Sequence, residues 1–185
     1  VFAKVVLGLP EPVVGLLNVG EEELKGHEYL REAAAILREA DLPSKFHGFI
    51  EGNDILEGKV DVVVTDGFTG NVALKTAEGV SKFYTHILSE AFRSSLFSRL
   101  SYLLARSTLR KVRQRVDPRR YNGAMMLGLN GIVVKSHGGT DALGFANALG
   151  VAIDMVTFGF NDTIIREFEK LEVDNVPLTK ATAPA

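Results

Sequence analysis

The segment that most constrains the fold is the apolar run VDVVV at 60–64, followed directly by TDGFTGNVALKT at 65–76. Four β-branched residues in five positions are typical of a strand that is covered on both faces. The glycines Gly67 and Gly70 then predict a sharp turn of the backbone before a helix at 71–93. A strand, a glycine turn and a helix in succession are the basic unit of an α/β protein.

The same alternation recurs along the chain. Residues 13–19 predict a second buried strand. Next comes a helix whose apolar face is built from Leu30, Ala33, Ala34 and Leu37 and which Pro43 closes. A later helix is expected to begin at Thr140, whose side chain could cap it. Strands that alternate with helices favour a three-layer α/β/α fold with a mainly parallel sheet.

We expect this α/β domain to cover residues 1–156, and residues 157–185 to form a helical extension with a flexible tail. The first residues, VFAKVVLG, fit the end of a helix stopped by Gly8, so we expect an N-terminal part to precede them. The sequence has no cysteine, no run of 18 apolar residues and no secretory signal pattern, which fits a cytoplasmic protein.

Three glycine-containing loops follow predicted strands and supply the candidate site. Ligands of parallel sheets bind at the carboxyl ends of the strands, and glycines let backbone N–H groups approach an anion closely. The candidate residues for binding substrate or phosphate are Asn18, Gly20, Asp66, Gly67, Gly70, Lys75, Lys135 and Gly138. His137 could donate or shuttle a proton, and Asn71 could donate to a substrate oxygen.

Each candidate also has a purely structural interpretation. Asn71 could be an N-cap, Asp66 could hold its own turn, and His137 could be a hydrogen-bonded structural residue. Lys75 and Lys135 could be ordinary surface lysines. The sequence alone leaves these alternatives open.

Several classes of active site find no support in the sequence. It has no Walker loop, no G-x-G-x-x-G fingerprint, no G-x-S-x-G elbow and no pair of histidines in metal-binding spacing. We therefore expect neither a metal nor a cofactor. A covalent protein nucleophile is also not evident, so the nucleophile would be the substrate itself.

The basic charge is concentrated in one segment. Residues 91–120 carry nine of the 21 Lys and Arg residues and one of the 23 acids. Their leucines and valines form two amphipathic stripes that predict a helical hairpin at 94–118, joined near Arg106 and Ser107. This hairpin could bury its stripe against the domain or a second subunit. Alternatively, its tip YLLARSTL could enter a bilayer and use Leu103, Leu104, Arg106, Leu109, Arg110 and Lys111 for membrane or carrier contact.

Three blocks together resemble a known family: GLLNVGEEELKGHE, GKVDVVVTDGFTGNVALKTAEG and GLNGIVVKSHGGTDA. They are similar to the C-terminal half of the bacterial phosphate acyltransferase of phospholipid synthesis, the PlsX family. The resemblance covers residues 1–156. It implies a fold like that of isocitrate and isopropylmalate dehydrogenases, and catalytic roles for Lys25 and Asn71.

The resemblance implies a reaction of acyl carrier protein thioester with inorganic phosphate, which gives acyl phosphate and free carrier protein. It also implies a homodimer that associates peripherally with the membrane. The basic hairpin itself favours an anionic membrane or a dimer contact over nucleic acid, because leucines are interleaved with its bases and it has no aromatic platform for nucleobases. Two alternatives remain: a phosphate acetyl- or butyryltransferase that uses acyl-coenzyme A, and a non-catalytic lipid-binding module.

Overall fold

The computed structural model describes residues 1–40, 42 and 44–173. The chain divides into two compact units. The sheet unit contains residues 1–65, 123–135 and 148–173, and the hairpin unit contains residues 66–122 and 136–147. Pro43 and the predicted tail at 177–185 lie outside the described residues.

The sheet unit is built on a parallel three-stranded sheet. Its strands are β1 (Val13–Leu17), β2 (Lys45–Ile50) and β3 (Val62–Val64), in the order β2-β1-β3. The register pairs Leu16 with Phe49 on one side and with Val64 on the other. The predicted mainly parallel α/β sheet is therefore confirmed.

Helix α2 (Glu28–Glu39) joins β1 to β2, and α3 (Asp54–Glu57) lies between β2 and β3. The core beneath α2 consists of Leu16, Ala34 and Phe49, and against it pack Leu30, Ala33, Leu37 and Phe46. The predicted apolar face of this helix is thus the face that packs on the sheet. Burial of such a face supplies most of the stability of a helix this short.

Strand β3 is less buried than its sequence predicts. Among the described residues it lies at the edge of the sheet, and Val64 is 43% exposed. The prediction that this strand is covered on both faces is wrong for the described part of the chain. A run of valines favours an extended, pleated backbone. It does not by itself show whether a neighbouring strand is present to cover the strand.

The remaining elements of the sheet unit are α1 (Phe2–Val5), the antiparallel pair β4 (Ala124–Met125) and β5 (Val134–Lys135), the later part of α6 (Ala142–Thr157) and α7 (Phe160–Val173). The ring of Phe160 is fully buried and meets the ring of Phe2 edge to face, with centroids 5.9 Å apart. The chain beyond 157 thus contributes a side chain to a packed core.

None of the helices in the described part of the chain combines, on its own, the length and the apolar composition of a membrane-spanning segment. Helices α6 and α7 meet that criterion of length and composition only as a pair, and the pair is bent by 53°.

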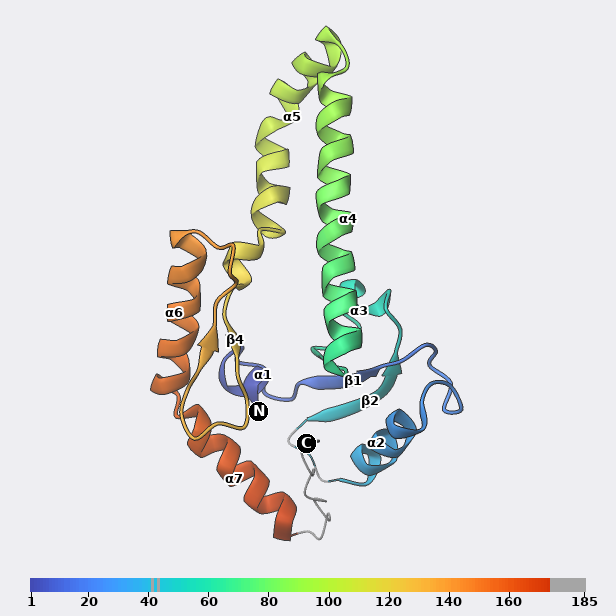
Figure 1. Ribbon diagram of the computed structural model, residues 1–185, viewed down its shortest axis with the longest axis vertical. Coiled ribbons are helices and arrows are strands. Elements are labelled where there is room, and N and C mark those ends of the chain that lie inside the picture. Colours follow the sequence, from blue (N-terminus) through green and yellow to red (C-terminus); the bar gives the residue numbers. More distant parts are fainter. Residues whose placement is uncertain (41, 43, 174–185) are drawn as a thin grey trace. The chain divides into compact units, whose positions relative to one another are not determined.

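The hairpin unit contains two long neighbouring helices (Figure 1), α4 (Gly67–Arg93) and α5 (Leu96–Arg115). Ser94 and Ser95 form the turn, and the Ser95 hydroxyl caps α5 by accepting from the Ser98 N–H. The rings of Phe92 and Tyr102 lie 5.4 Å apart across the hairpin. After α5 a short 3₁₀ helix, η1 (Pro118–Tyr121), leads out of the hairpin.

The hairpin therefore differs from the predicted one. Helix α5 is continuous through Arg106 and Ser107, where the sequence suggested a turn. The suggestion came from a shift in the apolar stripe, but neither Arg nor Ser breaks a helix as Gly or Pro would. The partner of α5 is α4, and the segment YLLARSTL lies within α5 rather than at a tip.

Candidate functional site

The loop after β1 carries Lys25 and is held by the side chain of Asn18. Asn18 is 8% exposed, and its Nδ2 donates to the carbonyl of Lys25 at 3.1 Å. Its Oδ1 accepts from the N–H of Val19 at 2.9 Å, and its own N–H pairs with the Ile50 carbonyl. The Asn18 amide therefore holds the loop, and its predicted contact with phosphate stays a prediction.

Gly26 makes this arrangement possible. Its φ is +79°, and a Cβ at this position would lie 1.9 Å from the Asn18 Oδ1. Both the backbone conformation and the close approach of Asn18 exclude a side chain. The turn from Glu22 to Lys25, closed by the Lys25 N–H on the Glu22 carbonyl, is thus followed at Gly26 by close packing against the Asn18 amide.

Charged residues hold the rest of this loop. Lys59 donates to Glu21 and lies 3.7 Å from the buried Asp54, while Arg31 donates to the Leu24 carbonyl at 3.2 Å. Hydrogen bonding to Glu21 raises the pKa of Lys59. Lys25 is different, because its side chain is 55% exposed and its Nζ lies 3.9 Å from Glu22. The loop thus fixes the backbone of Lys25 and leaves its ammonium group accessible.

The second candidate segment is the start of α4. The Asp66 carboxylate accepts from the Thr69 N–H at 2.9 Å and is the N-cap of the helix. Hydrogen bonds from Thr69 lower the pKa of Asp66. The helix consequently begins at Gly67, four residues before the predicted start, and Gly70 lies in its first turns. The alternative in which Asn71 is the N-cap is wrong.

A polar stripe runs along α4 from Asn71. Asn71, Lys75, Glu78 and Lys82 are separated by four, three and four residues and share one helix face. Lys75 donates to Glu78 at 3.0 Å. This bond is the main reason that the pKa of Glu78 lies below its usual range, and the charges of Lys75, His137 and Lys82 contribute.

The structure thus brings the Lys75–Glu78 pair and His137 into one electrostatic neighbourhood within the hairpin unit. Glu78 was not among the residues predicted from sequence. Its position three residues after Lys75, on the same helix face, was the available signal.

The third candidate loop runs from Ser136 to Asp141 and is anchored by Asn122. Asn122 is 8% exposed, accepts from the His137 N–H at 2.8 Å and donates to the Ser136 hydroxyl and the Gly144 carbonyl at 2.8 Å each. The exposed His137 ring accepts from the Gly139 N–H at its Nδ1, 3.2 Å away. His137 and Gly138 were predicted site residues, whereas Asn122 was not among them.

A network of charges supports the start of α6 beside this loop. Arg119 donates to Asp117 and, at 2.8 Å, to Asp141. Hydrogen bonding to Arg119 lowers the pKa of Asp117 to about 2 and lowers the pKa of Asp141. Asp141 also accepts from the Gly144 N–H, so Asp141 caps α6 in place of the predicted Thr140.

The predicted site residues are divided between the units. The sheet unit contains Asn18, Gly20, Lys25 and Lys135, and the hairpin unit contains Asp66, Gly67, Gly70, Asn71, Lys75, His137 and Gly138. Lys135 lies in β5 with an exposed side chain. Lys25 and Asn71 lie in different units, so a pocket that both residues share stays a prediction. In the described residues, no group of three or more His, Asp or Glu side chains could hold a metal ion.

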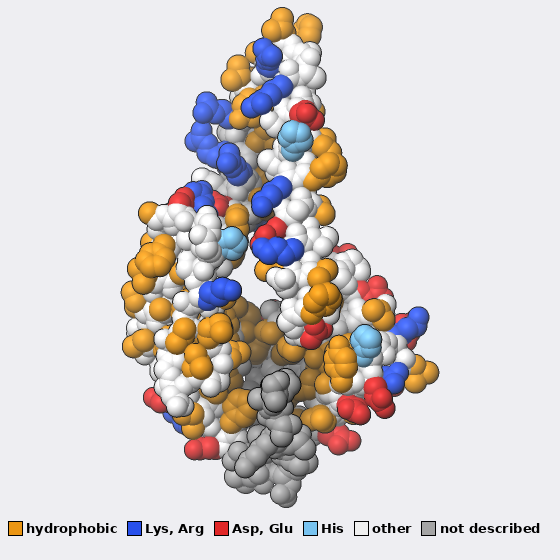
Figure 2. Space-filling view, viewed as in Figure 1, with side chains coloured by type: hydrophobic (Ala, Val, Ile, Leu, Met, Phe, Trp, Pro, Cys, Tyr) orange, Lys and Arg blue, Asp and Glu red, His pale blue; other side chains and the backbone are white. Residues whose placement is uncertain are grey.

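Most of the basic segment at 91–120 lies in α5, and its basic side chains are on the exposed surface of this helix. Figure 2 shows Lys and Arg side chains gathered along this helix. Arg106, Arg110 and Lys111 are exposed, as are Leu103 and Leu104, whereas Leu109 is half-buried.

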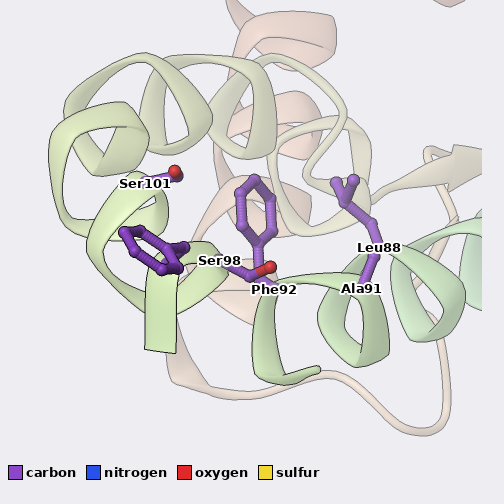
Figure 3. Close-up of a pocket in the computed structure, with 6 residues that line it drawn as sticks. Leu88, Ala91, Phe92, Ser98 and Ser101 are labelled. Carbon is purple, nitrogen blue, oxygen red and sulfur yellow. The ribbon is translucent and has the colours of Figure 1, made fainter. Parts of the chain in front are cut away.

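Near the turn of the hairpin lies an apolar hollow of about 330 Å³. Figure 3 shows Leu88 and Phe92 from α4 on one side and Ser98 and Ser101 from α5 on the other.

Comparison with known proteins assigns the chain to a family. Residues 1–163 match the profile of a family described as fatty acid synthesis protein, and the chain belongs to this family. It is 60% identical over 183 residues to a phosphate acyltransferase of Paramagnetospirillum magneticum, an alignment that covers 99% of this chain and 52% of the relative.

A phosphate acyltransferase of Rhodospirillum centenum is 61% identical over 172 residues, 93% of this chain and 48% of the relative. One of Rhodospirillum rubrum is 60% identical over 173 residues, 94% of this chain and 50% of the relative. The chain spans about half the length of these curated relatives. The resemblance to the PlsX family is confirmed.

The Lys25 loop yields a direct test of the role of Gly26. We expect Gly26→Ala to destabilise the protein by at least about 1–2 kcal/mol, because a side chain at positive φ is strained and its Cβ would displace Asn18. Gly52→Ala is the matched control, since a Cβ there meets no atom within 4 Å and its φ is not in the left-handed range. Urea unfolding monitored by circular dichroism measures both. Equal stability of the two variants would contradict the packing of Asn18 against Gly26.

Proposed function

We propose that the protein is a phosphate acyltransferase that forms acyl phosphate from acyl-[acyl carrier protein] and inorganic phosphate, for phospholipid synthesis. The observation that carries this proposal is identity of about 60% to phosphate acyltransferases over nearly the whole chain. The family description, fatty acid synthesis protein, supports an acyl substrate.

The chemistry suits a chain without an evident protein nucleophile. A phosphate oxygen forms a bond to the thioester carbonyl carbon, the carbon–sulfur bond breaks, and the carrier leaves as a thiol after taking up a proton. The protein has to hold a dianion against a carbonyl and stabilise the oxyanion that develops. Positioning of the two reactants contributes several kcal/mol to such a reaction.

Specific residues fit these tasks. Lys25 has an accessible ammonium group on a fixed loop and would neutralise phosphate. Asn71 is exposed on the polar stripe of α4 and would donate to the oxyanion. His137 would donate or shuttle a proton, and the carrier would approach over the basic surface of α5, where opposite charges steer its encounter.

We further propose the finer features that the resemblance implies. The fold would be the three-layer α/β/α arrangement of isocitrate and isopropylmalate dehydrogenases. The protein would be a cytoplasmic homodimer in peripheral contact with an anionic membrane. A solved structure of the intact protein without a helical layer on each face of the sheet would contradict the proposed fold.

The activity is tested by incubating the intact protein with long-chain acyl carrier protein and inorganic phosphate. We expect acyl phosphate and free carrier thiol in equal amounts, with little product from the corresponding acyl-coenzyme A. Preference for acyl-coenzyme A would favour a phosphate acetyl- or butyryltransferase. Lipid binding with neither activity would favour a non-catalytic lipid-binding module.

The catalytic assignment is tested with Lys25→Ala and Asn71→Ala. We expect each substitution to lower turnover at least about tenfold, because loss of a single oxyanion donor typically costs about 100- to 1,000-fold. Lys45→Ala, at the amino end of β2, and Thr76→Ala, on α4, are controls that should keep normal turnover. Near-normal turnover of both test variants would refute the assignment.

The proposed dimer is supported by the apolar side chains of the hairpin. In α4, Phe83, Tyr84 and Ile87 are exposed, and in α5 so are Leu100, Leu103 and Leu104. Contiguous apolar surface of this kind usually marks an interface. We expect light scattering to give a dimer at micromolar concentration, and Phe83→Glu to weaken it more than Thr85→Glu. A monomer of the unaltered protein would contradict the proposal.

The proposed membrane contact is moved to the turn of the hairpin, because YLLARSTL lies inside α5. Leu96 and Phe97 follow the turn and are 80% and 84% exposed, with Arg93 and Arg99 nearby in the chain. We expect Leu96→Glu with Phe97→Glu to lower sedimentation with anionic vesicles, while turnover on soluble carrier survives. Leu103→Glu with Leu104→Glu is the comparison. Greater loss of vesicle binding in the comparison variant would place the lipid contact on α5 instead of the turn.

A further inference from the structure

His137 is exposed, yet its ring and its backbone are both held by neighbours in the hairpin unit. The backbone N–H of His137 donates to the Asn122 Oδ1 at 2.8 Å, and the Gly139 N–H donates to the ring Nδ1 at 3.2 Å. A neutral imidazole that accepts at Nδ1 carries its proton on Nε2. The hydrogen bond from Gly139 therefore selects one of the two neutral forms of this ring.

Asn122 is the residue on which this arrangement depends. Its buried amide uses the oxygen for the His137 N–H and the nitrogen for the Ser136 hydroxyl and the Gly144 carbonyl. Each acceptor faces a donor, so the orientation of the amide is fixed by its partners. One side chain thereby ties the segment Ser136–His137 to the first turn of α6, which the pair of Arg119 and Asp141 also braces.

The surroundings of His137 make its proton position matter. The Lys75–Glu78 pair lies on the polar stripe of α4, in the same unit as His137. In the neutral ring whose Nδ1 accepts from Gly139, the Nε2–H group remains as a hydrogen-bond donor. An Nδ1–H form would lose the bond from Gly139 and leave the outer nitrogen as an acceptor.

We propose that Asn122 is a positioning residue that, together with the Gly139 N–H, presents the His137 imidazole as a neutral Nε2–H donor to the reacting substrate. The catalytic half of this proposal rests on the proposed function, whereas the preferred proton position does not. Asn122 touches no substrate in this account and acts through His137.

The proton position is measured by nitrogen NMR of the intact protein labelled with ¹⁵N-histidine. His137→Gln assigns the His137 signal among the four histidines. Spectra are recorded at about pH 9, where an ordinary histidine is neutral. We expect Nε2 protonated and Nδ1 unprotonated in the unaltered protein. A neutral His137 with the proton on Nδ1 would overturn the proposal.

The role of the Gly139 N–H is tested by a matched pair of substitutions. Gly139→Pro removes the N–H, and Gly139→Ala keeps it, with room for the new Cβ, which would lie 3.7 Å from the His137 Nδ1. We expect the proline variant to show both neutral forms of His137 and the alanine variant to resemble the unaltered protein. Equal spectra of the two variants would overturn this part of the proposal.

The role of Asn122 is tested by Asn122→Ala, with Asn147→Ala as control. Asn147 also donates a side-chain hydrogen bond in the hairpin unit, but to the Arg119 carbonyl, at 2.9 Å, and not to the His137 loop. We expect Asn122→Ala to mix the two neutral forms of His137 and to lower kcat at least about tenfold, with little change in KM for phosphate. The control should change neither quantity.

An unaltered His137 spectrum and kcat in folded Asn122→Ala protein would overturn the proposal. If Asn122→Ala does not fold, the milder substitution Asn122→Ser takes its place. The His137 spectrum and kcat of that variant then test the proposal in the same way. A loss of the His137 proton preference in protein that makes no acyl phosphate would support the positioning role and refute only the proposed function.

Discussion

Hydrogen bonding by two buried asparagine side chains is the interaction on which the candidate site depends. A buried amide costs free energy unless its oxygen and nitrogen both find partners. Asn18 and Asn122 satisfy this requirement by bonding to the backbone of the loops that carry Lys25 and His137. The need to satisfy each amide therefore fixes each loop, and the candidate side chains Lys25 and His137 are left accessible at the surface.

Charge has a different role in the two units. In the sheet unit, Lys59 joins Glu21 to the buried Asp54 and so supports the Lys25 loop from outside. In the hairpin unit, Asp66 starts α4, and Glu78 pairs with Lys75 on the face of that helix. The exposed Lys75–Glu78 pair contributes little to stability.

The sequence predicted the features that depend on local pattern. The parallel sheet and the apolar face of α2 follow from periodicity, and the resemblance to the phosphate acyltransferase family follows from loop motifs. The start of α4 was placed too late because the Asp66 cap recruits both glycines into the helix. The prediction of a turn near Arg106 and Ser107 was wrong, because a shift in the position of the apolar stripe does not break a helix made of good helix formers.

What could not be predicted from sequence depends on contacts between distant residues. Nothing near Asn122 in the sequence shows that it bonds to His137, 15 residues away. Likewise, the commitment of the Asn18 amide to the turn at Gly26 is a matter of packing in three dimensions. An asparagine that holds a loop has no sequence signature of its own in a glycine-rich motif, so this role of Asn18 is visible only in the structure.

Hydrogen exchange of two backbone amides shows whether the Asn18 and Asn122 side chains hold the two loops. The Val19 N–H donates to the Asn18 side chain, and the His137 N–H donates to the Asn122 side chain. If the asparagines hold the loops, both amides will exchange as slowly as the ladder amides of β1 in the intact protein. Exchange of either amide at the rate of an unstructured peptide would contradict the claim that these side chains fix the site.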